Sequence, residues 1–161
     1  MNKDNPISVR VMQENDLEWV TDLGQNTPEF KTETSAAQFF SLETLRRWVK
    51  DPNGVTLVAE IDGQSVGYLL GFYMTGPNDS YINCTVVEGK YRGKGVGHEL
   101  LNKALEEFSQ KGPESHKCDH VFCFVKEDDE AMLNLKRDVG FEIGAKGHYV
   151  EIMLPRKGKE F

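Results

Sequence analysis

The seven residues from Tyr91 to Gly97, YRGKGVG, combine three glycines with two cations directly before a long amphipathic pattern. Glycines leave the backbone free of Cβ atoms, and the first N–H groups of a helix have no intrahelical acceptor, so such a loop can bind an anion. The stretch therefore predicts a turn between a strand and a helix that binds phosphate, and its two cations favour a pyrophosphate. The apolar residues at helical spacing after the turn are Val96, Leu100, Leu101, Ala104, Leu105 and Phe108.

Two familiar phosphate-binding motifs do not fit these residues. A Walker loop requires Gly-Lys followed by Ser or Thr, but Gly93-Lys94 is followed by Gly95, and Glu88 occupies the place of the first glycine. A dinucleotide fingerprint read from Gly93 would need a glycine where His98 stands. An anion-binding loop of another kind and a tight turn without a ligand remain as alternatives.

Length and composition indicate one domain. With 161 residues, 39% of them hydrophobic, the chain is long enough for one substantial core and short for two. We expect a single domain over residues 1–154 and a disordered tail over 155–161. No apolar run reaches the roughly 18 residues that span a bilayer, and the N-terminus is too polar for a secretory signal, so we expect a soluble cytoplasmic protein. The net charge of −7 disfavours nucleic-acid binding and mildly favours cationic partners.

Hydrophobic periodicity predicts an α/β fold with a mixed, mostly antiparallel sheet flanked by helices. Asp62-Gly63 predicts a tight hairpin between two strands, and the uniformly apolar run 121–125 predicts a parallel strand covered on both faces. Residues 25–38 lack periodicity and predict a loop or a broken helix. The expected strands are 7–12, 55–61, 65–74, 81–87 and 121–125, with a last bent strand or hairpin at 141–154; the expected helices are 16–23, 42–51, 96–111 and 129–139.

The residues from Val87 to Leu101 resemble the acetyl-CoA-binding motif of the GNAT family of N-acetyltransferases, and the order of elements is similar to that family along nearly the whole chain. The resemblance implies acetyl-CoA as cosubstrate. It assigns the pyrophosphate to the loop backbone at Arg92, Gly93, Lys94, Gly95, Val96 and Gly97. It also implies that Val87, with Val86 as its neighbour, offers a backbone N–H to the thioester carbonyl.

A second segment ends in Val139-Gly140-Phe141 and is similar to the family pattern, except that Lys136 stands where the family often has a tyrosine that protonates the leaving thiolate. We expect Lys136 to be a solvated helix lysine, with a role as proton donor as the alternative. Some family members keep a carboxylate near the position of Asp79 as the base. Asp79 lies in the turn sequence PNDS, so it is equally a residue that hydrogen-bonds its own backbone.

The acceptor is predicted to be an amine, on a small molecule or on a peptide or protein, with no nucleic acid, membrane or metal involved; a homodimer is compatible with this reading. Phe30, Phe39, Phe40 and Trp48 either line the acceptor site or pack helices onto the sheet. Tyr81 and Tyr149 are further candidates on the substrate side, and Glu127, Asp128 and Asp129 form an acidic run near the expected acceptor opening.

Transfer is expected to be direct, because the sequence shows no activated nucleophile. Cys84 and Cys123 lie in apolar strand runs where burial raises the pKa of a thiol. In the run HKCDH, His116, Cys118 and His120 lack an evident fourth ligand for a metal. The alternative is that the chain is a non-catalytic acyl-CoA-binding or regulatory domain. This alternative stays open because Lys136 replaces the tyrosine that the family often has there.

Overall fold

One mixed sheet organises the part of the chain that the computed structural model describes, residues 6–34, 36–148 and 150. Its strand order follows the sequence, β1-β2-β3-β4-β5; the first four strands are antiparallel to their neighbours, and β5 is parallel to β4. The α/β fold class predicted from periodicity is confirmed. The strands are β1 (Ser8–Val11), β2 (Gly54–Ile61), β3 (Gln64–Met74), β4 (Asp79–Val87) and β5 (Val121–Cys123).

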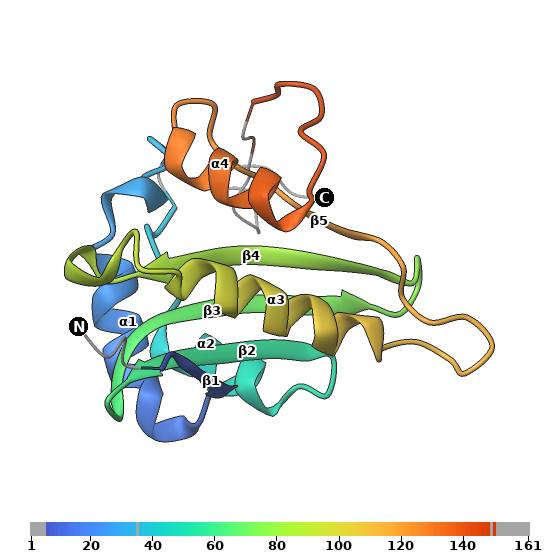
Figure 1. Ribbon diagram of the computed structural model, residues 1–161, viewed down its shortest axis with the longest axis horizontal. Coiled ribbons are helices and arrows are strands. Elements are labelled where there is room, and N and C mark those ends of the chain that lie inside the picture. The colour runs from blue at the N-terminus through green and yellow to red at the C-terminus, as the bar shows by residue number, and fades with distance from the viewer. Residues whose placement is uncertain (1–5, 35, 149, 151–161) are drawn as a thin grey trace, which may run out of the picture.

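Helices cover both faces of this sheet (Figure 1). α1 (Leu17–Gln25) and α2 (Leu42–Lys50) lie behind it in Figure 1, whereas α3 (Val96–Ser109) crosses the front and α4 (Glu130–Val139) packs beside α3. Each face has its own buried cluster: Leu57, Leu69 and Ile82 lie under α3, and Val58, Leu70 and Cys84 lie under α1 and α2. None of the helices described is long and apolar enough to cross a membrane. Single 3-10 turns occur at Glu14–Asp16, Pro28–Phe30 and Gly89–Tyr91.

Several ends of helices and strands lie where single residues in the sequence predict them. The hairpin at Asp62-Gly63 is confirmed, because both residues have positive φ, 53° and 74°. Ser41 caps α2 by accepting a hydrogen bond from the Thr44 N–H at 3.2 Å. Gly140 ends α4 with φ 102°.

Two expectations about the C-terminal third need correction. The strand predicted over 121–125 ends at Cys123 and is not covered on both faces, because Phe122 and Phe124 are 39% and 46% exposed. The helices α1 and α2 pack on the clusters of β2, β3 and β4 and leave these two rings uncovered. Residues 141–148 are irregular; the rest of the strand or hairpin expected at 141–154, and the tail 155–161, lie outside the described residues.

An extra residue in β4 changes which face its side chains occupy. Leu70 of β3 pairs with Cys84, but the next residue, Gly71, pairs with Ile82, so Asn83 is a bulge. As a result Ile82 packs under α3 while Cys84 packs on the opposite face, although two residues separate them and a regular strand would place both on one face. The bulge follows directly after Ile82, the last residue of β4 that pairs with β5.

Candidate active site

β4 and β5 separate at one end, and this opens an edge of β4. Their parallel pairing runs only from Ser80 opposite Val121 to Ile82 opposite Cys123, while β4 continues to Val87. No pairing of residues 83–87 with β5 is found among the described residues. We refer to this unpaired stretch, 83–87, and the space beside it as the β4–β5 gap.

The hydrogen-bond alternation of β4 identifies the groups that face the gap. The Glu88 N–H donates to the Val66 carbonyl on β3 at 2.9 Å, so in an antiparallel ladder the amides of Val86 and Cys84 also face β3. The N–H groups of Val87 and Thr85 then point the other way, toward the gap. Consistently, the Val87 carbonyl accepts from Arg92 Nε at 3.1 Å rather than from β3. Of the two valines named by the resemblance, Val87 has its N–H on the open side.

The three glycines of the loop after β4 serve different purposes. Gly93 and Gly95 have φ of 74° and 89°, a conformation that L side chains rarely adopt, and an added Cβ at Gly93 would meet no atom within 4 Å. Gly97 lies inside α3, and a Cβ there would come within 2.7 Å of Leu135 on α4. Gly93 and Gly95 therefore leave an open cradle, whereas Gly97 allows α4 to pack closely against α3.

The cradle stands at the N-terminus of α3. Gly95 is the N-cap residue and has no side chain to cap the first N–H groups, which have no intrahelical acceptor. The adjacent Val96 is buried in the core under α3, which fixes this end of the helix to the sheet. The backbone of Gly95, Val96 and Gly97 thus has the geometry that binds phosphate groups at helix N-termini.

The two cations of the loop are placed differently. Arg92 is held by the Val87 carbonyl and by Glu29, whose Oε1 lies 3.0 Å from Nη1. Lys94 Nζ lies over the Tyr91 ring at 5.2 Å from its centroid. Arg92 therefore connects the end of β4, the loop and the 3-10 turn at 28–30, while Lys94 is exposed and packs over Tyr91 beside Gly93 and Gly95.

Lys136 is buried, and the expectation of a solvated helix lysine is wrong. Only 2% of the surface of Lys136 is exposed. Its pKa is lowered from the ordinary value, mainly because burial disfavours the charged ammonium. The side chain hydrogen-bonds the Cys123 thiol on β5, and Nζ lies 5.0 Å from the centroid of the Phe141 ring. The Gly97–Leu135 contact explains the burial, because it brings α4 down onto the strands one residue before Lys136.

The thiols around Lys136 locate its ammonium. It acts electrostatically on Cys123 of β5 and on Cys84 of β4, lowering the pKa of each, although burial outweighs this effect and raises the pKa of Cys84 to about 12. A charge that reaches thiols on both strands lies where they begin to separate. The raised pKa of both thiols agrees with the expectation that neither is an activated nucleophile.

In the described part of the chain, two buried hydroxyl groups have no hydrogen-bond partner, and one of them belongs to the β4–β5 gap. Among the described residues, Tyr68 Oη and Thr85 Oγ1 are buried side-chain oxygens without a hydrogen-bond partner. Tyr68 lies in the cluster under α1 and α2, whereas Thr85 belongs to the β4–β5 gap. An unpaired buried hydroxyl is costly, so its presence together with the open cradle at Gly93 and Gly95 fits an extended polar ligand with a phosphate group.

Asp79 does not bond its own turn; it pairs with a histidine. Asp79 Oδ1 lies 3.1 Å from Nδ1 of His120, which precedes β5. Asp79 is the first residue of β4 and stands three residues before Ile82, about 10 Å along the strand from the opening of the gap. The neighbouring Cys118 is buried, with Sγ 3.1 Å from Ser80 Oγ, and no metal-binding group of His, Cys, Asp or Glu occurs in the described residues.

A row of aromatic rings runs across the sheet on the face of α2. Phe72 of β3 contacts Tyr81 of β4, which contacts Phe122 of β5, with ring centroids 5.9 and 5.2 Å apart; Phe122 stacks on His120 at 5.6 Å. The four aromatic residues whose role was open pack against the cluster under α1 and α2: Phe30, Phe39, Phe40 and Trp48. The packing alternative holds for them, while Phe122 extends the row to the surface; Tyr149 lies outside the described residues.

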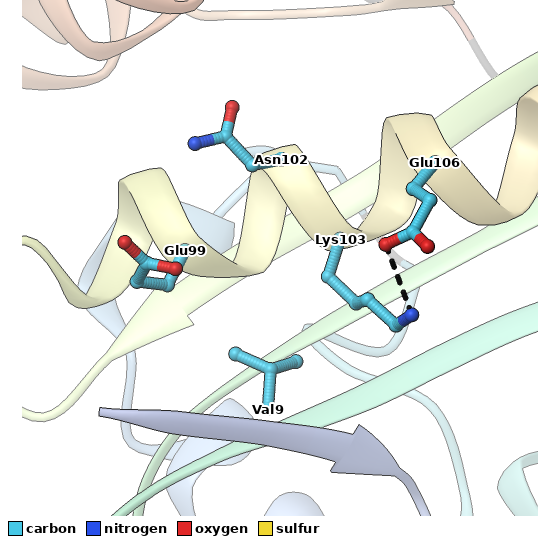
Figure 2. A pocket seen from close by; sticks show the side chains of 5 residues that line it. All are labelled: Val9, Glu99, Asn102, Lys103 and Glu106. Atoms are coloured by element: carbon cyan, nitrogen blue, oxygen red, sulfur yellow. Dashed lines mark hydrogen bonds and ion pairs between the residues drawn. The ribbon is translucent and has the colours of Figure 1, made fainter. Parts of the chain in front are cut away.

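The surface has two shallow depressions, and they differ in their relation to the β4–β5 gap. One of about 350 Å³ lies between β1 and α3 (Figure 2), where Lys103 pairs with Glu106 at 3.0 Å, and no residue of the gap lines it. Another of about 300 Å³ is lined by residues 31–34, 36 and 38. The Lys31 carbonyl accepts from Lys126 Nζ, just after β5, at 2.6 Å. The second depression is therefore adjacent to the loop that leaves β5.

Comparison with known proteins identifies relatives. Residues 18–141 match the model of the acetyltransferase (GNAT) family. Over 66 residues the chain is 33% identical to the L-2,4-diaminobutyric acid acetyltransferase of Nocardia farcinica, a match that covers 40% of this chain and only about a third, 34%, of that relative.

Solved structures show the same fold. The aminoglycoside N-acetyltransferase AAC(6')-Iy in complex with CoA superposes with a TM-score of 0.72 at 16% identity, covering 94% of this chain and 98% of that chain. The ribosomal-protein-alanine N-acetyltransferase of Brucella melitensis gives 0.64 at 27% identity, covering 84% of each chain.

Replacing Gly95 with valine tests the cradle. A β-branched residue at φ 89° is strained, and its side chain obstructs the backbone N–H groups, so we expect affinity for acetyl-CoA to fall about tenfold or more. Calorimetric titration measures the loss, and the melting temperature reports whether the fold persists. Gly89→Ala is the matched control, because its φ is not positive and an added Cβ there meets nothing within 4 Å. Unchanged affinity of the Gly95 variant would contradict the site.

Proposed function

The chain belongs to the acetyltransferase (GNAT) family, and on that premise we propose that it transfers an acetyl group from acetyl-CoA to an amine. The observation that carries the proposal is the β4–β5 gap, which opens next to a glycine cradle at the start of α3. We extend the proposal to residues 1–154 as one catalytic domain, since the family match covers 18–141 without interruption. A purely acyl-CoA-binding role is less consistent with a buried ammonium at the opening of the gap.

Acetyl-CoA supplies a thioester whose carbonyl carbon is open to attack by a neutral amine. In the proposed arrangement the backbone N–H groups of Gly95, Val96 and Gly97 bind its pyrophosphate. The Val87 N–H, which faces the gap, donates to the thioester carbonyl and to the oxyanion that develops there. In this proposal the acceptor approaches from the side of the aromatic row and of the depression lined by residues 31–34, 36 and 38.

Turnover with an amine library tests the function most simply. The named relatives act on a diamino acid, an aminoglycoside or a ribosomal-protein alanine, so the library should contain diamines, amino sugars and peptides with free N-termini. We expect labelled acetyl to appear on at least one class, with a rate that climbs from about pH 6 toward about pH 8 or 9, because only the neutral amine attacks. Tight acetyl-CoA binding with no turnover on any class would instead support the binding-only role, and a kinetically competent acetyl-cysteine detected by mass spectrometry would exclude direct transfer.

Lys136 is proposed as the group that protonates the leaving thiolate. Burial lowers the pKa of its ammonium toward that of a thiol, and it lies at the opening of the gap. The donor must be protonated, so activity should decline again as the pH rises above this lowered pKa. In Lys136→Met we expect kcat to fall about a hundredfold, near the lower end for general acids because a thiolate needs little help, and the high-pH decline to disappear. Lys50→Met, at a lysine whose side chain is 65% exposed, is the control; unchanged kcat in the Lys136 variant would refute the role.

Asp79, paired with His120, is proposed to accept the proton of the amine through water. The pair stands on the face of the aromatic row, about 10 Å along β4 from the opening of the gap, so the proton would travel along a chain of several waters. In Asp79→Asn we expect kcat/KM near pH 7 to fall about a hundredfold and the deficit to shrink at higher pH, where the amine loses its proton without help. Asp138→Asn removes a comparable carboxylate, 3.4 Å from His98 between α3 and α4, and should change little. Equal loss in both variants, or none at Asp79, would assign Asp79 a structural role.

A further inference from the structure

The first strand of the sheet has an edge that no other strand covers. β1 pairs with β2 on one side, and no strand lies on its other side in the part of the chain that the structure describes. The Met12 N–H donates to the Thr56 carbonyl at 2.9 Å. Because backbone direction alternates along an antiparallel strand, the N–H and C=O groups of Arg10 also face β2. The backbone groups that point outward belong to Ile7, Val9 and Val11.

This edge lacks the features with which proteins usually protect one. Exposed edge strands commonly carry a lysine, a proline, a bulge or an inward-pointing charge that prevents pairing with another chain. The register of β1 against β2 has no bulge. The one charged residue of β1, Arg10, is held by Asp16 and Glu60, each 2.7 Å away. The side chains beside the outward groups are all apolar, so the edge can accept a further strand.

Space beside the edge is free on the face that α3 covers. Val11 pairs with Leu57, which lies in the cluster under α3, so its side chain stands on that face, as does that of Val9. Val11 is 59% exposed there. Val9 lines the depression of about 350 Å³ between β1 and α3 (Figure 2). Side chains of an added strand therefore have room on this face.

We propose that two copies of the chain pair through these edges, β1 against β1 in antiparallel orientation, and form a dimer with one continuous sheet. This inference goes beyond the proposed function and does not depend on it. Val9 lies opposite Val9 of the second copy on the two-fold axis, and Val11 lies opposite Ile7 of the second copy. Every outward donor then meets an outward acceptor, and the exposed Val11 side chain is covered by an apolar one.

The charges beside the edge select this register. An axis at Arg10 would set two guanidinium groups directly opposite each other, and like charges in that position are destabilising. With the axis at Val9, Arg10 stands opposite Ser8 of the second copy and keeps its own two carboxylates. The Val11 carbonyl accepts from Arg10 Nη1 at 3.3 Å, and its second lone pair serves the partner strand.

The composition of the edge favours a second copy over another partner. An apolar stripe is matched by an apolar stripe of the same spacing, and an identical chain always supplies one. A pairing this short buries little surface, so we expect a weak dimer whose population depends on concentration.

Sedimentation velocity of the full chain over about 5–500 µM tests the dimer by mass action. We expect the unchanged chain to shift from monomer toward dimer as its concentration rises. Val11→Lys places a charge against an apolar side chain, and Val9→Pro removes an outward N–H without disturbing the ladder to β2. Because each substitution acts twice across a two-fold axis, each variant should associate about tenfold or more weakly.

The matched control is Ile143→Lys, which makes the same kind of change at an aliphatic residue that is 46% exposed and lies after α4. It should leave association unchanged, and melting temperatures of the dilute variants show whether each keeps its fold. In the unchanged chain, NMR should show that the N–H groups of Val9 and Val11 exchange quickly when dilute and slowly in the dimer. The Arg10 N–H, which faces β2, should be protected in both states.

A chain that stays monomeric at the highest concentration would overturn the proposal. A dimer that persists in the folded Val11→Lys variant would also overturn it, because the contact would then lie elsewhere. The same holds for a dimer that forms without slowing exchange at Val9 and Val11. Equal loss of association in Ile143→Lys would show a nonspecific effect of added charge and would likewise count against pairing through β1.

Discussion

The early end of the pairing between β4 and β5 is the constraint on which the site depends. A sheet normally satisfies both edges of an interior strand, but β4 loses β5 after Ile82 and continues to Val87 paired with β3 alone. The amides of Thr85 and Val87 are thereby left facing a space rather than a strand. Water can satisfy these groups in the free protein, and a bound ligand can take its place. A ligand with alternating polar groups along an extended chain is the natural complement.

Packing elsewhere holds this opening in place. The bulge at Asn83 lets β4 serve two cores, with Ile82 under α3 and Cys84 on the opposite face. Gly97 brings α4 against α3 through its contact with Leu135. That contact in turn places Lys136 among the thiols at the point of separation. One glycine thus links the helix that carries the anion cradle to the helix that carries the buried ammonium.

Much of the fold follows from local sequence, and the site follows only in part. The Asp62-Gly63 turn and the glycine loop before α3 can be predicted from the sequence, because each needs positive φ angles that glycine and aspartate tolerate. Lys136 was misjudged because its burial results from the Gly97–Leu135 contact between elements far apart in sequence. Nothing in the alternating pattern around Asn83 predicts the bulge. Thr85 carried no signal either, because an unpaired hydroxyl becomes visible only when its neighbours in space are known.

Amide hydrogen exchange, followed residue by residue by NMR with and without acetyl-CoA, tests the central claim most directly. The account predicts that the N–H groups of Thr85 and Val87 exchange quickly in the free protein and slow markedly when acetyl-CoA binds. The N–H of Val86, which faces β3, should be protected in both states. Exchange at Thr85 and Val87 that stays unchanged on binding, or that is already slow without ligand, would contradict the claim that the open edge of β4 is where acetyl-CoA binds.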